Sequence, residues 1–177
     1  MGGGLDELAR LTRMERISGP VPDWADVRSA LGFDVPADYK RLIELYGAGA
    51  FNDYIQIYGP EESVQAFNLK AQGLFWDAYL KEEWEGSPEA VPVPLRKRDS
   101  TVLDWGCTED GPQLLWIAER GVAPERWTVA FHLVEGEAWE FHPRSAVEVL
   151  LALARNELAA RPLPPSWPSD EPLAYGP

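Results

Sequence analysis

The sequence predicts an α+β fold: helices in the first half, an antiparallel or mixed sheet in the second, and a helix that closes the domain. Two observations predict it. Apolar residues recur at helical spacing before residue 47, whereas short apolar segments separated by turn residues follow residue 100. We expect the helices to pack on one side of the sheet. The 177 residues suit one domain, expected at residues 1–161 and followed by a proline-rich tail at 162–177.

Three helices are predicted before residue 47. Leucines at positions 5, 8 and 11 form the apolar stripe of the first helix, over residues 5–14. Asp23 is the expected N-cap of the second helix, and Gly32 ends it. Pro36 fits the first turn of the third helix, which Gly47 ends.

The rest of the chain predicts one further helical stretch, five strands and a last helix. Residues 47–51 form a glycine-containing link to a strand at residues 54–58, where the side chains alternate. Residues 60–85 are rich in apolar and aromatic side chains and predict helix, although Gly73 interrupts the pattern. The four later strands are expected at residues 101–105, 113–117, 127–134 and 138–141.

Turn and cap residues connect these later elements. Asp110-Gly111 is a hairpin signal between the first two of the four strands, and Glu135-Gly136 can turn the chain between the last two. Ser145 and Glu148 have the spacing of a capping box, so a last helix is expected over residues 145–158. Six prolines in the last 16 residues predict an extended or disordered tail.

Charge excludes several classes of partner. Asp and Glu number 29 against 16 Lys and Arg, which gives a net charge of −13. The one basic cluster, residues 96–98, is short, so we expect neither nucleic-acid binding nor attachment to an anionic membrane. Between Asp99 and Glu140 there are nine acids and two bases. This acidity fits either solubility alone or a surface for a basic protein partner.

Cysteine usage and apolar runs bear on location. Cys107 is the only cysteine, so a disulfide framework within the chain is excluded. The first residues lack the basic and apolar regions of a signal peptide. No apolar run approaches the roughly 20 residues that a membrane-spanning helix needs. We therefore expect a cytoplasmic protein.

No catalytic residue, cofactor or metal site is predicted. The sequence lacks the phosphate-loop, dinucleotide-binding, zinc-protease and serine-hydrolase motifs. Cys107 is close to acidic residues in the sequence and lacks the positive surroundings that activate a thiol. Glu137 and Glu140 have opposite parity in a strand, which argues against the carboxylate pair of a glycosidase.

The two histidines are expected to be structural. If Glu135-Gly136 is a two-residue turn, His132 and His142 point to opposite faces of the sheet, because the side-chain period of a strand is two. This register argues against a metal site shared by the two histidines. This register pairs His132 with Trp139 and Val129 with His142.

Eight tryptophans are a high count for a chain of this length. Trp167 lies in the tail and would be either a free anchor for a partner or a clamp onto the domain. Five others lie on predicted elements and are expected in the core: Trp24, Trp105, Trp116, Trp127 and Trp139.

Two groups of residues resemble the SUKH superfamily, which includes bacterial immunity proteins of toxin systems and fungal cell-wall assembly regulators. The resemblance covers about residues 22–158 and implies a SUKH-like α+β domain that binds proteins and has no catalytic centre. The first group is Trp24, Leu31-Gly32, Val35-Pro36-Ala37-Asp38-Tyr39-Lys40 and Tyr46-Gly47-Ala48-Gly49-Ala50-Phe51. The second is Asp104-Trp105-Gly106-Cys107-Thr108-Glu109-Asp110-Gly111, Leu115-Trp116, Trp127 and Trp139-Glu140-Phe141.

The sequence and the resemblance together predict a non-catalytic immunity protein that binds and neutralises a basic toxin domain. A regulatory scaffold that binds an endogenous enzyme is the alternative, motivated by the proline-rich tail. A hydrolase that uses unrecognised carboxylates ranks below both. The candidate contact residues lie around predicted hairpin turns or in the tail: Asp104, Glu109, Asp110, Glu135, Glu137 and Trp167.

Overall fold

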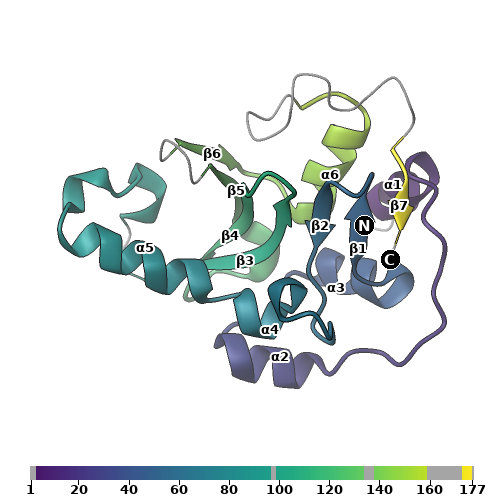
Figure 1. Cartoon of the computed structure of the whole chain (residues 1–177), viewed down its shortest axis with the longest axis horizontal. Helices are drawn as coiled ribbons and strands as arrows, with labels where there is room; N and C mark the ends of the chain where they lie inside the picture. Colours follow the sequence, from purple (N-terminus) through teal and green to yellow (C-terminus); the bar gives the residue numbers. More distant parts are fainter. Residues whose placement is uncertain (1–2, 97–98, 134–137, 159–172, 177) are drawn as a thin grey trace.

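A computed structural model describes residues 3–96, 99–133, 138–158 and 173–176 (Figure 1). Its helices and strands confirm the predicted α+β class. The helices are α1 (Gly3–Leu11), α2 (Trp24–Leu31), α3 (Ala37–Tyr46), α4 (Leu69–Gln72), α5 (Phe75–Glu85) and α6 (Ala146–Ala154). The strands are β1 (Gly49–Phe51), β2 (Ile55–Ile57), β3 (Ser100–Thr108), β4 (Gln113–Glu119), β5 (Thr128–Leu133), β6 (Ala138–His142) and β7 (Tyr175–Gly176).

The strands form one sheet in the order β6-β5-β4-β3-β2-β1-β7, and each neighbouring pair is antiparallel. Most of this order follows the chain, because short turns join β1 to β2 and β3 to β4. The pairing of β5 with β6 has the predicted register, with His132 opposite Trp139 and Val129 opposite His142.

The predicted helix ends are confirmed at the residues that were expected to make them. Asp23 caps α2 by accepting hydrogen bonds from the N–H groups of Ala25 and Asp26, at 3.0 and 3.1 Å. Gly32 ends α2 with φ of 73°, a left-handed conformation that favours glycine. Ser145 and Glu148 form the reciprocal capping box of α6.

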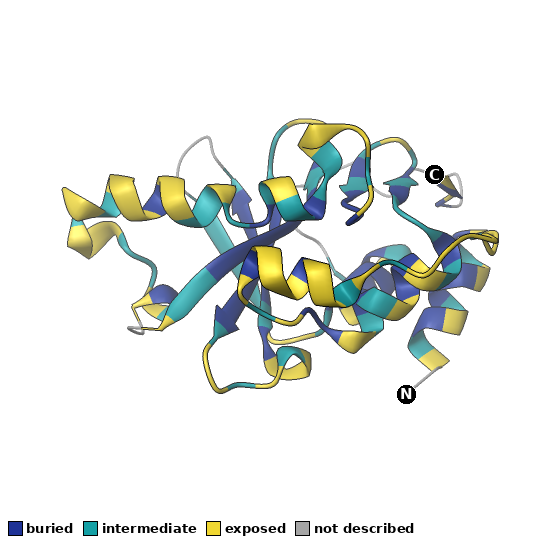
Figure 2. Cartoon of the chain, turned by 90° about the horizontal axis from the view of Figure 1, so that it is seen from below, coloured by how far each residue is buried: buried dark blue, intermediate teal, exposed yellow. Residues whose placement is uncertain are grey.

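The prediction that helices pack on one side of the sheet is wrong. One face, with Leu103 and Trp116, packs in the larger core with α1, α2, α3 and α6. The opposite face, with Val102 and Ile117, packs in a second core with Leu80 of α5. Because both faces are covered, consecutive residues of β3 and β4 are buried, and not only every second residue. Figure 2 shows these strands as a deeply buried band between helices with exposed outer surfaces.

Three of the five tryptophans predicted in the core are buried there: Trp105, Trp116 and Trp127. Trp24 and Trp139 are only partly buried. The indole N–H of Trp24 donates to the Glu44 carboxylate at 2.7 Å, which accounts for its position at the edge of the core.

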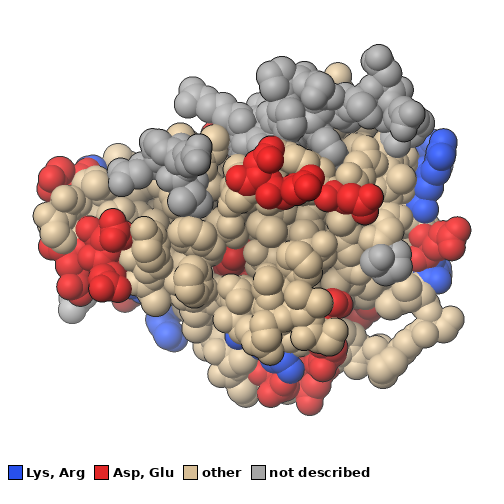
Figure 3. Space-filling model, viewed as in Figure 1, with Lys and Arg blue, Asp and Glu red and all other residues tan. Residues whose placement is uncertain are grey.

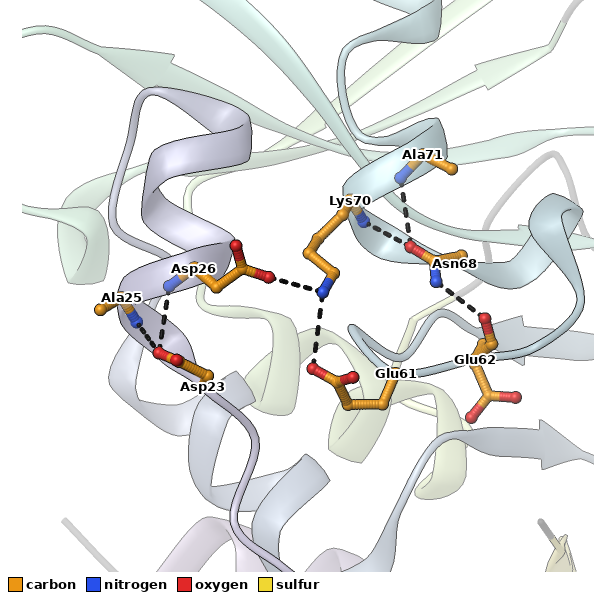
Figure 4. Close-up of polar contacts among 8 residues, drawn as sticks. All are labelled: Asp23, Ala25, Asp26, Glu61, Glu62, Asn68, Lys70 and Ala71. Carbon is orange, nitrogen blue, oxygen red and sulfur yellow. Dashed lines mark hydrogen bonds and ion pairs between the residues drawn. The ribbon is translucent and has the colours of Figure 1, made fainter.

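The predicted helical stretch at residues 60–85 is interrupted. Asn68 caps the short α4 through its side-chain oxygen, and its amide donates to the carbonyl of Glu62 at 2.7 Å. Lys70 connects α4 to α2, because its Nζ lies 2.7 Å from the Asp26 carboxylate and 3.6 Å from that of Glu61 (Figure 4). Between α4 and α5, a Cβ on Gly73 would lie 2.6 Å from a methyl group of Leu31. Only glycine fits this close approach without movement of its neighbour.

The last described residues of the predicted proline-rich tail are extended and lie against the sheet. β7 pairs with β1 and extends the sheet by one strand. The hydroxyl of Tyr175 donates to the carbonyl of Gly47 at 2.8 Å, and Leu173 is buried. Residues 173–176 are therefore part of the domain. Trp167 lies outside the described residues, so both predictions for its role stay untested.

Candidate protein-binding surface

Two turns far apart in the sequence meet at one end of the sheet. The first, between β1 and β2, contains Asn52 and Asp53 with φ of 48° and 54°, and the second follows β3. The backbone N–H of Glu109 donates to the carbonyl of Tyr54 at 2.9 Å. The Tyr54 hydroxyl donates to the Asp110 carboxylate at 2.8 Å. These two bonds hold the turns side by side.

The joined turns present an acidic surface. Asp53, Glu109 and Asp110 are all exposed, and we call these three residues the acidic turn surface. Figure 3 shows a strip of acidic side chains across the upper middle of this face of the molecule. Carboxylates gathered on one rim attract a positively charged partner and accelerate its approach. The predicted contact residues Glu109 and Asp110 therefore lie where such a partner can reach them.

Tyr54 is held as a neutral hydrogen-bond donor in this surface. Burial is the main cause that raises its pKa to about 12, and the hydrogen bond to Asp110 adds to the effect. The hydroxyl therefore keeps its proton over the whole physiological range. The position of Asp110 is fixed by a donor that does not cancel its charge.

The described part of the β5–β6 hairpin ends at the same end of the sheet as the β3–β4 turn. His132 pairs with Gln113, which directly follows the β3–β4 turn. The last described pair of this hairpin is Leu133 with Ala138. Glu135 and Glu137 lie between these two residues in the sequence and outside the described residues, so their role in contacts stays a prediction.

The prediction that Asp104 contacts a partner is wrong, because its side chain is inside the protein. Asp104 is 1% exposed, and its backbone N–H donates to the carbonyl of Gly73 at 2.9 Å. One carboxylate oxygen accepts from the N–H of Gly106 at 3.4 Å, and the other has no hydrogen-bond partner among the described residues. Both faces of β3 are covered at this position, four residues before the turn.

Burial raises the pKa of Asp104 well above its ordinary value, although Gly106 and Tyr58 favour the ionised form. Burial likewise raises the pKa of the neighbouring Cys107 thiol. A thiol held in its neutral form is a poor nucleophile, which agrees with the expectation that the surroundings of Cys107 do not activate it.

The histidines lie on opposite faces of the sheet, as their register predicts. The ring of His132 stacks on Trp139 at a centroid distance of 4.3 Å, whereas His142 contacts Phe131 at 5.0 Å. Burial lowers the pKa of both imidazoles, that of His132 to about 4. Within the described ranges, no group of three or more His, Cys, Asp or Glu residues is arranged to hold a metal ion.

An aromatic pocket that was not predicted from the sequence lies on the α5 side of the sheet. A cavity of about 210 Å³ lies between α5 and the β5–β6 hairpin. Its lining includes Tyr79, Trp84, His132 and Trp139. The signal was the number of aromatic residues in the α5 segment: positions 75, 76, 79 and 84 cannot all face one core.

Comparisons with known proteins do not assign the chain to a family: no family model, no curated protein and no solved structure matches it. None of the helices in the described part of the chain is long and apolar enough to cross a membrane.

Proposed function

We propose that this chain is a non-catalytic immunity protein that binds a basic toxin domain through the acidic turn surface. The observation that carries the proposal is the joining of the two turns, which holds three exposed carboxylates at one end of the sheet. A toxin that acts on nucleic acid needs a basic surface to bind phosphate, and an acidic protein is complementary to that surface.

Two further observations support a binding role. The net charge of −13 gives a long-range attraction to a basic partner, so association is fast at low salt. The resemblance of residues 22–158 to the SUKH superfamily implies a protein-binding domain, with immunity proteins among its members. Asp104 is 1% exposed, so a substrate has no access to its carboxyl group, and the raised pKa of the Cys107 thiol makes that residue a poor nucleophile.

The test compares two charge reversals at opposite ends of the sheet. Glu109→Lys changes the acidic turn surface, and Glu125→Lys changes an exposed glutamate in the connection between β4 and β5. Each substitution changes the net charge by the same amount. Tagged wild-type protein and both variants are incubated with lysate of the source organism at low salt, and bound proteins are eluted with rising salt and identified.

We expect one basic protein to be retained by the wild type and by Glu125→Lys, and to elute at lower salt from Glu109→Lys. The purified partner should associate several-fold more slowly with Glu109→Lys, and its toxicity should be suppressed by co-expression of the wild type. Equal elution from the two variants would contradict the assigned surface. Recovery of an endogenous enzyme without toxicity would favour the regulatory scaffold instead.

A further inference from the structure

The aromatic pocket between α5 and the β5–β6 hairpin has the composition of a cation-binding site. Trp84 and Trp139 are partly buried, with ring centroids 6.3 Å apart, and Tyr79 is 45% exposed. The faces of tryptophan and tyrosine rings attract cations, tryptophan most strongly. Glu83 adds a carboxylate to the lining, and the lining contains neither Lys nor Arg.

The charges around the pocket reinforce this preference. Lys81 is the basic residue of α5, and its Nζ is paired with the Asp77 carboxylate at 2.7 Å, four residues back on the same helix. Glu82 and Glu85 are exposed acids on the same helix. With Lys81 paired to Asp77, the three glutamates leave α5 with a net negative charge, which favours a cation close to this helix.

His132 forms part of the lining and is neutral at physiological pH. It is 3% exposed, and burial lowers its pKa to about 4. Its Nδ1 is buried and has no hydrogen-bond partner among the described residues. A neutral imidazole does not repel a cation, and the unpartnered nitrogen is a polar group that a polar ligand in this pocket can satisfy.

We propose that this pocket binds the guanidinium group of an arginine side chain from the protein partner. At about 210 Å³ the cavity is smaller than the sites that hold drug-sized ligands, so it suits a single side chain. Arginine is favoured over other cations because its planar group stacks on indole rings and donates to a carboxylate such as Glu83 at the same time. A few side chains contribute most of the binding energy of an interface, and arginine is enriched among them.

The position of the pocket explains why an arginine anchor would be useful. His132 pairs with Gln113, which follows the turn that carries Glu109 and Asp110. The pocket and the acidic turn surface thus belong to the same end of the sheet. A partner steered by the exposed carboxylates would find a confined site for one of its basic side chains.

The identity of the protein that carries the arginine rests on the proposed function, but binding of a guanidinium group to the pocket does not. The pocket is therefore tested with a small arginine compound and without a partner. The full chain is titrated with N-acetyl-arginine amide, and the indole N–H resonances of Trp84 and Trp139 are followed by NMR. N-acetyl-citrulline amide, which has the same shape and no charge, is the matched ligand. Tetramethylammonium chloride tests whether any cation suffices.

We expect saturable shifts of both indole resonances with the arginine compound and at least ten-fold weaker binding of the citrulline compound. Glu83→Gln should weaken arginine binding several-fold, whereas the neighbouring Glu82→Gln, outside the pocket lining, should leave it unchanged. Equal binding of arginine and citrulline, equal effects of the two variants, or tighter binding of tetramethylammonium would each overturn the assignment. Failure of the lysate experiment with success here would reject the proposed partner and retain the pocket.

Discussion

The hydroxyl of Tyr54 donates to the carboxylate of Asp110 at 2.8 Å, although the two residues are 56 positions apart in the sequence. Through this bond the β1–β2 turn and the β3–β4 turn become one surface. The carboxylate keeps its negative charge because Tyr54 donates a proton without carrying a positive charge. The geometry of the proposed interface therefore depends on a residue that need not touch the partner.

Tyr54→Phe removes this hydroxyl and preserves the ring. Because the lost bond connects a neutral donor to a partly solvated carboxylate, we expect the free energy of unfolding to fall by about 1 kcal/mol. The amide hydrogen of Glu109, which is bonded to the Tyr54 carbonyl, should exchange faster. Urea denaturation and native-state hydrogen exchange measure the two effects. An unchanged exchange rate at Glu109 would show that the backbone bond alone holds the turns together.

Asp104→Asn should stabilise the protein, and more so at higher pH. The folded state holds the proton of Asp104 more tightly than the unfolded chain does. At pH values above the ordinary pKa of 3.8, folding is therefore accompanied by uptake of a proton. Stability from this group is therefore lost as the pH rises toward its folded-state pKa. Asparagine has the same shape and no ionisation. Thermal unfolding at pH 5 and pH 8 should show the larger gain at pH 8, and a gain that shrinks with pH would contradict this ionisation.

His132→Phe should have the opposite pH dependence. The pKa of His132 is lowered by burial to about 4, so the unfolded chain binds more protons between pH 6.5 and 4. Over that window the wild type should lose up to about 3 kcal/mol through this residue, while above it the contribution is constant. Phenylalanine keeps an aromatic ring against Trp139 and cannot be protonated. Urea denaturation from pH 4 to pH 7 should show a shallower slope for the variant, and parallel slopes would refute the buried neutral imidazole.

Local signals explain which parts of the fold could be predicted from the sequence. Asp23, Gly32 and Ser145 act within one helical turn, so their cap roles can be read from neighbouring residues. The register of His132 against Trp139 follows from counting residues around a two-residue turn. Neither inference needs knowledge of distant segments.

Long-range packing explains what could not be predicted. β1 and β7 are too short to have a pattern of their own, and they form because residues 50–51 and 175–176 pair across the chain. Asp104 lies next to an irregularity in the β3–β4 register, and a helix on each side of the sheet leaves it no path to solvent. The second covered face had a signal in the continuous apolar run at residues 114–118, which is typical of a strand buried on both faces.

Gly106 lies where the backbones of β2 and β3 approach closely, so its substitution tests the sheet that supports both turns. A Cβ at this residue would lie 2.6 Å from the backbone oxygen of Gln56. This oxygen belongs to the backbone of β2, so it cannot move aside as the end of a flexible side chain could. Gly106 also pairs with Ile57 and Leu114, so movement of its backbone would disturb two strand pairs. We expect Gly106→Ala to lower the free energy of unfolding by about 1–3 kcal/mol.

The matched control is Gly86→Ala, because a Cβ at Gly86 has no heavy atom within 4 Å and its φ of −84° suits alanine. This variant should be neutral or more stable by about 0.5 kcal/mol, since alanine restricts the unfolded chain. Urea denaturation of the two variants side by side separates a steric clash from the general effect of replacing glycine. If Gly106→Ala were as stable as Gly86→Ala, β2 and β3 would have to be able to separate without cost, and the rigid joining of the two turns would be wrong.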